Sequence, residues 1–268
     1  ELTNMETSPN RYYRTCELNA VASYKDGKTI LSDKFYTQPF KIMKPFHIKK
    51  DLMTVMMQTA SAGILKGDTQ EMHFVVEDNA KMELLSQSFE KLHKMDGGSA
   101  RRDTTIKVGK NALFKYSPLP TIPFYDSGFD STIHVELEDS TSQLMLLEVL
   151  SGGRIAYGEE FVYRFYNSHI TVREGGKLIY NDNAQYNPSE MDMKSLGMYE
   201  GFTHMATLLF FNIEKASDLD TIREIIDNNK KVEGGASIIQ SGDTSVKLLG
   251  HSAQDLYDLC EELMNLMI

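Results

Sequence analysis

Apolar and polar residues alternate with a period of two along three successive stretches of the chain. The stretches 73–85, 104–116 and 132–147 each hold two β-like runs separated by a polar turn. Ala80 and Ala112 occupy equivalent places in the first two copies, 32 residues apart. A repeat of this length with two strands per unit indicates stacked β-layers, as in a solenoid or distorted β-helix.

Further β-like runs flank the repeats on both sides. Asp26 and Gly27 give a hairpin signal between the first two runs. Residues 187–199 contain Pro188 and no clear period, which predicts a long connection. The flanking runs are 12–24, 28–40, 52–59, 161–172, 177–180 and 203–213.

The period changes to that of helices near the C-terminus. Ser217 with Asp220, and Ser252 with Asp255, have the spacing of capping boxes and predict two helix starts. A small hairpin around Gly242 is expected between the helices. The apolar stripe of the first helix is Leu219, Ile222, Ile225 and Ile226, and that of the second is Leu256, Leu259, Cys260, Leu263, Leu266 and Met267.

These elements together predict a mainly β fold. We expect a distorted β-helix, a solenoid-like stack of strands, over residues 11–213. A small α+β C-terminal part with two helices follows over residues 214–268. This part is too small to bury both helices alone, so we expect it to pack on the β-part within a single integrated domain.

The composition of the chain disfavours several classes of protein. The chain has 268 residues with 28 basic and 38 acidic ones, a formal net charge of −10, which disfavours a nucleic-acid binder. No apolar run approaches the roughly 20 residues of a membrane helix. Cys16 and Cys260 stand at opposite ends without a Cys-x-x-Cys pattern, and no signal-peptide pattern is present. We therefore expect a cytoplasmic protein in a reducing compartment.

The chain lacks the sequence motifs of several familiar enzyme classes. Residues 63–68 contain two glycines but no Gly-Lys-Ser/Thr phosphate loop, and residues 151–154 lack the Gly-x-Ser-x-Gly elbow. The seven histidines are scattered, and no Cys/His spacing describes a zinc site. The sequence therefore offers no candidate for these familiar catalytic, phosphate-binding or zinc sites.

Several charged residues nevertheless stand in or beside apolar β-runs. Glu148 lies inside the apolar run 144–150, where a carboxylate must be paired, hydrogen-bonded or hydrated. Arg154, six residues later, is a plausible partner, and Asp68 and Glu159 lie at neighbouring corners. Two interpretations remain open: a buried ion-pair network that holds the corners, or a hydrated, carboxylate-lined passage for a cation.

An ordered series of motifs resembles the urease accessory protein UreD family, called UreH in Helicobacter. The resemblance runs from about residue 12 to the last helix. Many family members have Pro-Gly-Gly where residues 61–63 are Ser-Ala-Gly, and Lys66 precedes Gly67 here. The matching motifs are Thr-Gln-Pro-Phe-Lys-Ile-Met at 37–43, Gly-Asp at 67–68, Ser-Gln-Ser-Phe-Glu-Lys at 86–91, Ser-Pro-Leu-Pro-Thr-Ile-Pro-Phe at 117–124, Leu-Glu-Val-Leu-Ser-Gly-Gly-Arg at 147–154, Gly-Glu-Glu-Phe at 158–161 and Gly-Phe-Thr-His at 201–204.

The resemblance implies a non-catalytic urease maturation chaperone. Such a scaffold binds UreF, which recruits the GTPase UreG, docks on apo-urease as a heterocomplex that can dimerise, and passes nickel through a polar internal tunnel. Nickel is then cargo and not a resident cofactor. On this interpretation the transient nickel path includes Asp68, Glu148 and Glu159. The residues that line or support the tunnel are Ser86, Gln87, Glu90, Arg154 and Asp182.

Two further choices stay open from the sequence. The apolar side chains Leu256, Leu263 and Met267 are a candidate interface for helical UreF, or they simply cover the end of the β-stack. For the whole chain, the alternatives to a urease chaperone are a polysaccharide-acting β-helix enzyme and a purely structural β-solenoid module.

Overall fold

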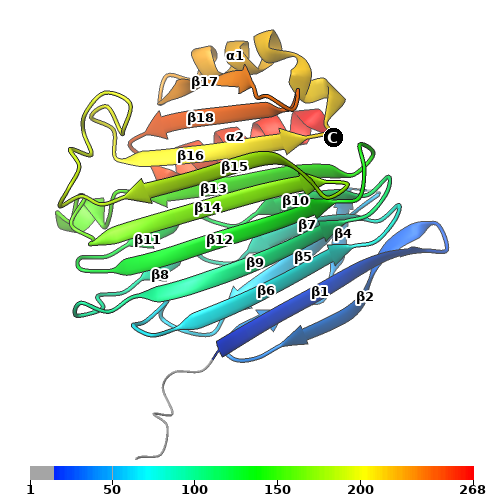
Figure 1. Ribbon diagram of the computed structural model, residues 1–268, viewed down its shortest axis with the longest axis horizontal. Helices are drawn as coiled ribbons and strands as arrows, with labels where there is room; N and C mark the ends of the chain where they lie inside the picture. The colour runs from blue at the N-terminus through cyan, green and yellow to red at the C-terminus, as the bar shows by residue number, and fades with distance from the viewer. Residues whose placement is uncertain (1–14, 50) are drawn as a thin grey trace, which may run out of the picture.

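Two β-sheets face each other and form the body of the protein (Figure 1). The computed structural model describes residues 15–49 and 51–268, so residues 11–14 of the predicted β-part lie outside the described residues. The seven-stranded sheet has the order β15-β14-β12-β9-β6-β1-β2. Its strands are β1 (Thr15–Lys25), β2 (Lys28–Tyr36), β6 (Thr69–Val76), β9 (Ala100–Val108), β12 (Gly128–Leu137), β14 (Phe165–Glu174) and β15 (Lys177–Tyr186).

The second sheet has eleven strands, with the main order β17-β18-β16-β13-β10-β7-β5-β3. Three short strands lie off this path: β4 pairs with β5, β8 with β11, and β11 also with β13. The strands are β3 (Phe40–Ile42), β4 (Phe46–Lys49), β5 (Leu52–Thr59), β7 (Lys81–Ser86), β8 (Glu90–Leu92), β10 (Leu113–Ser117), β11 (Thr121–Pro123), β13 (Gln143–Ser151), β16 (His204–Phe211), β17 (Val232–Ile238) and β18 (Thr244–Gly250).

The repeat predicted from residues 73–147 is present as a chain path that alternates between the two sheets. Strands β6, β9 and β12 lie side by side and parallel in the seven-stranded sheet. Their partners β7, β10 and β13 do the same in the eleven-stranded sheet. Among the described residues both strand orders are open paths, so the structure shows a mainly β fold of two facing sheets. The description as a distorted β-helix stays a prediction.

Equivalent turns stack where the chain crosses from one sheet to the other. Asn79 and Asn111 both have positive φ, 66° and 53°, a conformation that asparagine tolerates in turns. The next residues, Ala80 and Ala112, are fully buried. The Asn79 N–H donates to the Lys110 carbonyl at 2.9 Å, which ties each turn to the next. Alanine fits these buried crossings because a larger side chain would collide with the stacked turn.

An apolar core fills the space between the sheets. In each strand every second residue points inward, toward the opposite sheet, as the period of two requires. In β9, for example, Ile106 and Val108 are buried inward, while Lys107 is exposed. Inward residues of both sheets, such as Phe74, Phe114 and Leu146, form one cluster.

The two helices cover the other face of the eleven-stranded sheet. Helix α1 (Leu219–Asn228) packs on β17, and α2 (Ala253–Met267) packs on β13, β16 and β18. Strands β17 and β18 extend the same sheet beyond β16, so the C-terminal α+β part continues the large sheet (Figure 1). None of the described helices is long and apolar enough to cross a membrane.

The predicted helix starts are confirmed for α2 and wrong by one residue for α1. Ser252 caps α2, and its Oγ accepts a hydrogen bond from the Asp255 N–H at 3.2 Å. The cap of α1 is Asp218, whose carboxylate accepts from the Thr221 N–H at 3.2 Å. Ser217 instead ends a short 3-10 helix, η2 (Glu214–Ser217), because its hydroxyl donates to the Glu214 carbonyl.

A buried ionic cluster fixes α2 to the sheet. Lys115 of β10 is 0% exposed, and its Nζ lies 2.7 Å from a Glu83 oxygen and 2.6 Å from a Glu261 oxygen. Thr54 Oγ1 donates to the other Glu83 oxygen at 2.8 Å, and Ser117 contacts Glu261. A buried lysine is stable here because two carboxylates and their hydrogen-bond partners surround it.

Candidate functional site

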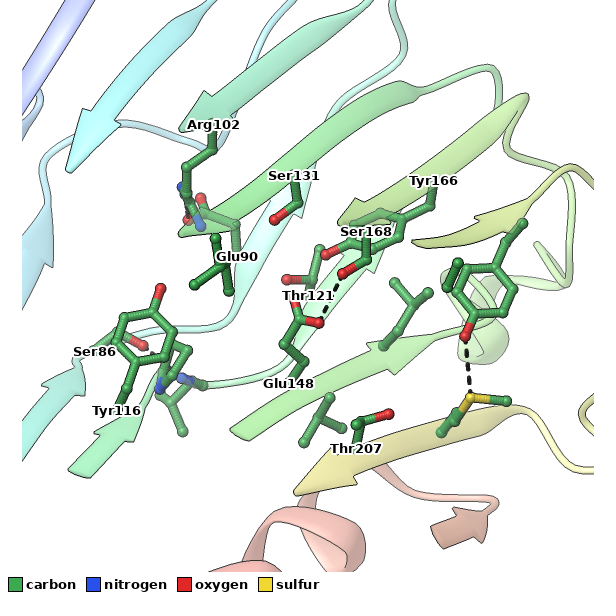
Figure 2. A pocket seen from close by; sticks show the side chains of 18 of the residues that line it. Ser86, Glu90, Arg102, Tyr116, Thr121, Ser131, Glu148, Tyr166, Ser168 and Thr207 are labelled. Atoms are coloured by element: carbon green, nitrogen blue, oxygen red, sulfur yellow. Dashed lines mark hydrogen bonds and ion pairs between the residues drawn. The ribbon is translucent and has the colours of Figure 1, made fainter. Parts of the chain in front are cut away.

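A narrow polar pocket interrupts the core between the two sheets (Figure 2). Its volume of about 60 Å³ is enough for about four water molecules at roughly 15 Å³ each. On one side lies the main apolar cluster, and on the other a smaller one that contains Phe129 and Leu150. The pocket forms where inward positions change from apolar to polar. These polar positions include Ser86 of β7, Arg102 of β9, Ser131 of β12, Glu148 of β13, Ser168 of β14 and Asp182 of β15.

Glu148 is the central acid of this pocket. It follows Leu144 and Leu146 in the inward series of β13, so the strand directs its carboxylate between the sheets. Ser168 Oγ donates a hydrogen bond of 2.8 Å to Glu148 Oε2, as Figure 2 shows. Burial raises the pKa of Glu148 to about 7, and the charge on Asp182 adds to the rise. The Ser168 hydrogen bond and the Arg102 charge oppose it without cancelling it.

Arg102 forms the basic side of the pocket. Its Nε and Nη2 donate to Gln70 Oε1 at 2.8 and 2.6 Å, and Nη2 also pairs with Glu90. Both charged side chains are nearly buried, 11% and 12% exposed. The guanidinium therefore neutralises Glu90 and leaves Glu148 and Asp182 as the uncompensated acids of the pocket.

Neutral oxygens complete the lining. Ser86 Oγ accepts a hydrogen bond of 2.7 Å from the Leu119 N–H, which fixes the proline-rich segment after β10 against β7. Tyr116, Tyr166 and Thr207 add hydroxyl groups to the same pocket. Burial raises the pKa of Tyr116 and Tyr166, so both phenols stay protonated. Such a set of carboxylates and hydroxyls suits a hydrated cation that binds weakly.

The structure brings four of the predicted site residues together and leaves four outside. Ser86, Glu90, Glu148 and Asp182 all line the pocket. The residues that do not line it are Asp68, Gln87, Arg154 and Glu159.

The predicted Glu148–Arg154 pair is wrong. Arg154 Nε donates to Glu159 Oε2 at 2.8 Å, and a second contact joins Nη2 to Oε1. The Tyr125 N–H also donates to Glu159, at 3.2 Å. Because β13 ends at Ser151, the chain turns away before Arg154, and the guanidinium meets the acid of its own corner. This pair lowers the pKa of Glu159.

Asp68 and Gln87 lie at other corners. The Leu65 N–H donates to Asp68 Oδ2 at 2.8 Å, which closes the glycine-bearing turn before β6. Burial raises the pKa of Asp68, and the charge on Glu90 raises it further, so the two acids lie within electrostatic reach. Gln87 is exposed and contacts Gln58 on the neighbouring strand.

The comparison with known proteins decides the family. A family model described as UreD urease accessory protein matches residues 15–268. The chain belongs to the UreD family. This confirms the resemblance found from the motifs.

Curated relatives of the UreD family match along nearly the whole chain. Urease accessory protein UreH of Helicobacter pylori (strain G27) is 36% identical over 241 residues, 90% of each chain. Urease accessory protein UreD of Acetivibrio thermocellus is 33% identical over 260 residues, 96% of this chain and 99% of the relative. Urease accessory protein UreD of Flavobacterium johnsoniae is 29% identical over 247 residues, 90% of this chain and 88% of the relative.

The acidic, histidine and cysteine side chains of this UreD-family chain are dispersed in the part that the structure describes. Within residues 15–49 and 51–268, no three His, Cys, Asp or Glu side chains group so as to hold a metal ion. Glu148 and Asp182 are the acids that face one pocket without a basic partner. Two carboxylates with neutral oxygens bind a divalent ion less tightly than a closed set of ligands.

The predicted partner interface on α2 of this UreD-family chain is wrong. Leu256 and Leu263 are 0% exposed and Met267 is 6% exposed, all within the cluster between α2 and the eleven-stranded sheet. The structure shows these side chains packed on a face of the eleven-stranded sheet, whereas the alternative placed them over the end of the β-stack. Leu266, which was counted in the same stripe, is 46% exposed and lies outside the core.

Arg102 is the charged pocket residue that the sequence analysis missed. The signal was available in the alternation of β9, where Ala100, Arg102 and Thr104 continue the inward series of Ile106. An arginine in phase with buried residues predicts a buried ion pair. Its partners Gln70 and Glu90 lie on other strands, and their identity needed the strand order.

Proposed function

We propose that this UreD-family chain is a non-catalytic urease maturation protein that passes nickel ions to apo-urease through the pocket around Glu148. In this proposal the chain acts in the cytoplasm. It binds UreF, which brings the GTPase UreG, and the assembly docks on urease. Nickel is the cargo.

The observation that supports the proposal is the polar pocket inside an otherwise apolar two-sheet core. Isolated carboxylates are expensive to bury, so an acid at an inward position of β13 calls for a role beyond packing. Nickel(II) accepts carboxylate and hydroxyl oxygens as ligands. A conduit needs sites that admit an ion and also release it.

The protonation of Glu148 gives the proposed conduit its weak binding. With a pKa of about 7, the carboxyl is divided between its acid and its ionised form near neutral pH. A nickel ion must displace the proton to bind, and the returning proton favours release. Asp182 is the second acid of the path, and Ser86, Ser168 and Thr207 supply neutral oxygens.

The remaining predicted residues receive different roles in this proposal. Asp68 stays a candidate nickel ligand on the Glu90 side of the pocket, because it lies within electrostatic reach of Glu90. Glu159 is compensated by Arg154, so we assign this pair to support of the corner and not to nickel transfer. Gln87 remains a supporting residue at the corner that follows β7 and Ser86.

The test uses co-expression of the chain with UreF, UreG and apo-urease subunits of the same organism. Size-exclusion chromatography reports assembly, and mass spectrometry of the elements reports the nickel content of purified urease. We expect Glu148→Gln to assemble normally while the nickel content of urease falls severalfold. The matched control is Glu136→Gln, which changes an exposed, outward carboxylate of β12 and should alter neither readout.

Two results would count against the proposal. If Glu148→Gln lowers assembly and nickel content equally, Glu148 is a structural residue. If the wild-type chain is folded and soluble but does not co-elute with UreF and UreG, the chaperone role itself fails. An assay of turnover on acidic glycans would then distinguish the two alternatives. Turnover would support the polysaccharide-acting enzyme, and its absence would favour the structural module.

A further inference from the structure

A second cavity, unrelated to the Glu148 pocket, opens between the corner after β13 and the start of α2. It measures about 850 Å³ and lies beside the short helix η1 (Ile155–Tyr157), so we call it the η1 groove. Its walls come from segments far apart in the sequence: β8, β11, the η1 corner, the start of β16 and the first turn of α2. A cavity of this size is at the upper end of the range of ligand pockets.

One wall of the η1 groove is a stack of rings and a guanidinium. The Arg154 Cζ atom lies 4.2 Å from the Phe124 ring centroid and 5.2 Å from that of Tyr157. The His93 ring also packs edge-on against Phe124, with the ring centroids 4.9 Å apart. The guanidinium of Arg154 donates to Glu159, which does not line the groove. The stack is therefore fixed before any ligand arrives.

The charges around the η1 groove are all of one sign. Among the described residues no aspartate or glutamate lines it, although the whole chain has ten more acidic than basic residues, for a formal charge of −10. Lys91 and Arg154 supply the basic groups, and because Arg154 is paired with Glu159, Lys91 carries the uncompensated positive charge. The side chain of Lys91 is exposed and makes no ion pair within the described residues 15–49 and 51–268. A cleft lined by one sign of charge attracts ligands of the opposite sign.

The opposite wall of the η1 groove adds hydrogen-bonding groups without adding negative charge. His204 is 7% exposed, and its Nδ1 lies 2.8 Å from Thr203 Oγ1. Burial and the nearby His251 lower the pKa of His204 to about 4, so the ring is neutral near pH 7. The first turn of α2, at Ala253 and Gln254, faces the same space. Amides at this position lack partners within the helix and favour anionic groups.

The rim of the η1 groove indicates the kind of ligand. Tyr157 is 79% exposed, and Tyr125 on the adjoining corner is 54% exposed. Exposed tyrosines next to arginine are typical of protein–protein contact surfaces. A small ligand would be enclosed on most sides, whereas this cavity opens past Tyr157 to the surface.

We propose that the η1 groove binds an acidic segment of a partner protein, with a carboxylate at Lys91 and an apolar or aromatic side chain against Phe124. The stacked wall supplies the apolar contact. The basic groups, and the absence of lining acids, supply the preference for a negatively charged segment. This inference does not depend on nickel passage.

The experiment uses the absence of tryptophan from the chain. Tyr157→Trp places a single fluorophore on the rim of the η1 groove. Tyr24→Trp places the same reporter on β1, away from the groove, at a site that is 49% exposed in wild type. The probe is a blocked peptide of aspartates and glutamates around one phenylalanine. A peptide with lysines in place of the acids and inorganic phosphate serve as comparison probes.

The expected result is a saturable change in emission from Tyr157→Trp with the acidic peptide, and none from Tyr24→Trp. Binding should weaken as salt increases. Adding Lys91→Glu should weaken it about tenfold, because the change reverses the charge at the groove. Lys94→Glu is the matched control, since Lys94 is exposed, lies three residues away and does not line the groove. It should change the affinity by less than about twofold.

Three results would overturn the inference. One is no saturable response of Tyr157→Trp to the acidic peptide. A second is an equal response to the basic peptide, or to phosphate alone at the same affinity. The third is equal weakening by Lys91→Glu and Lys94→Glu.

Discussion

A carboxylate between two sheets makes the stability of the protein depend on pH. The unfolded chain leaves the carboxyl of Glu148 near its ordinary pKa of 4.5, whereas the fold raises it to about 7. Above pH 7 the folded state holds a partly buried ionised carboxylate, and the penalty is fully present. As pH falls from 7 to 4.5, the folded state takes up the proton first and the penalty declines.

We predict that Glu148→Gln is more stable than wild type at alkaline pH. The variant keeps the shape of the protonated acid and can still accept the Ser168 hydrogen bond. At pH 8 the gain should be at most about 3 kcal/mol, and at pH 5 less than about 1 kcal/mol. Urea unfolding at the two pH values measures it. A constant difference across pH would mean that the carboxyl is not buried in the folded state.

The Arg102–Glu90 pair should show strong coupling. Arg102→Met leaves the Glu90 carboxylate nearly buried without its cation, and we expect a loss of about 3 kcal/mol. The double variant with Glu90→Gln should recover a large part of that loss, because the stranded charge is gone. Urea unfolding of wild type, both single variants and the double variant gives the coupling energy. Additive losses would show that the pair contributes no interaction of its own.

At the scale of single elements, alanine substitution of two leucines three residues apart tests which face of α2 packs on the sheet. Leu263 is 0% exposed, and Leu266 is 46% exposed. We predict that Leu263→Ala lowers the free energy of unfolding by about 3 kcal/mol through cavity formation. Leu266→Ala should change it by less than about 0.5 kcal/mol. Equal effects in urea unfolding would place the helix in a different rotation about its axis.

Elements were predictable where the signal was local. The repeat was visible because each copy carries its own alternation and its own turn, with asparagine at 79 and 111. The cap of α2 at Ser252 was visible for the same reason, and the cap of α1 was misplaced by one residue because Ser217 and Asp218 are both good caps.

Contacts between corners were not predictable in this way. Glu148 stood out as an acid in an apolar run, but its partner depends on which strand lies opposite. Ser168 is that partner, because β14 lies in the facing sheet. Sequence proximity suggested Arg154 instead, and Arg154 pairs with Glu159 five residues further along.

At the scale of the whole molecule, α2 closes the outer face of the eleven-stranded sheet. We predict that deletion of residues 252–268 prevents folding, because it exposes the apolar face of β13, β16 and β18 and removes Glu261 from buried Lys115. Loss of the near-ultraviolet circular dichroism signal and aggregation in size-exclusion chromatography would show this. A truncated chain that remains monomeric with a native spectrum would contradict it.

The anchoring of α2 has a consequence for the order in which the chain is made. Glu261 contacts Lys115, and Tyr257 contacts Ser117, across 146 and 140 residues of sequence. Each strand of the repeat, in contrast, pairs with a strand made about 30 residues earlier, and can form while the ribosome still holds the rest. Until the residues of α2 emerge, the half-built sheet therefore exposes an apolar face, and Lys115 has its Glu83 contact but not its Glu261 contact. The apolar outer face of β13, β16 and β18 is covered only at a late step, after α2 has left the ribosome.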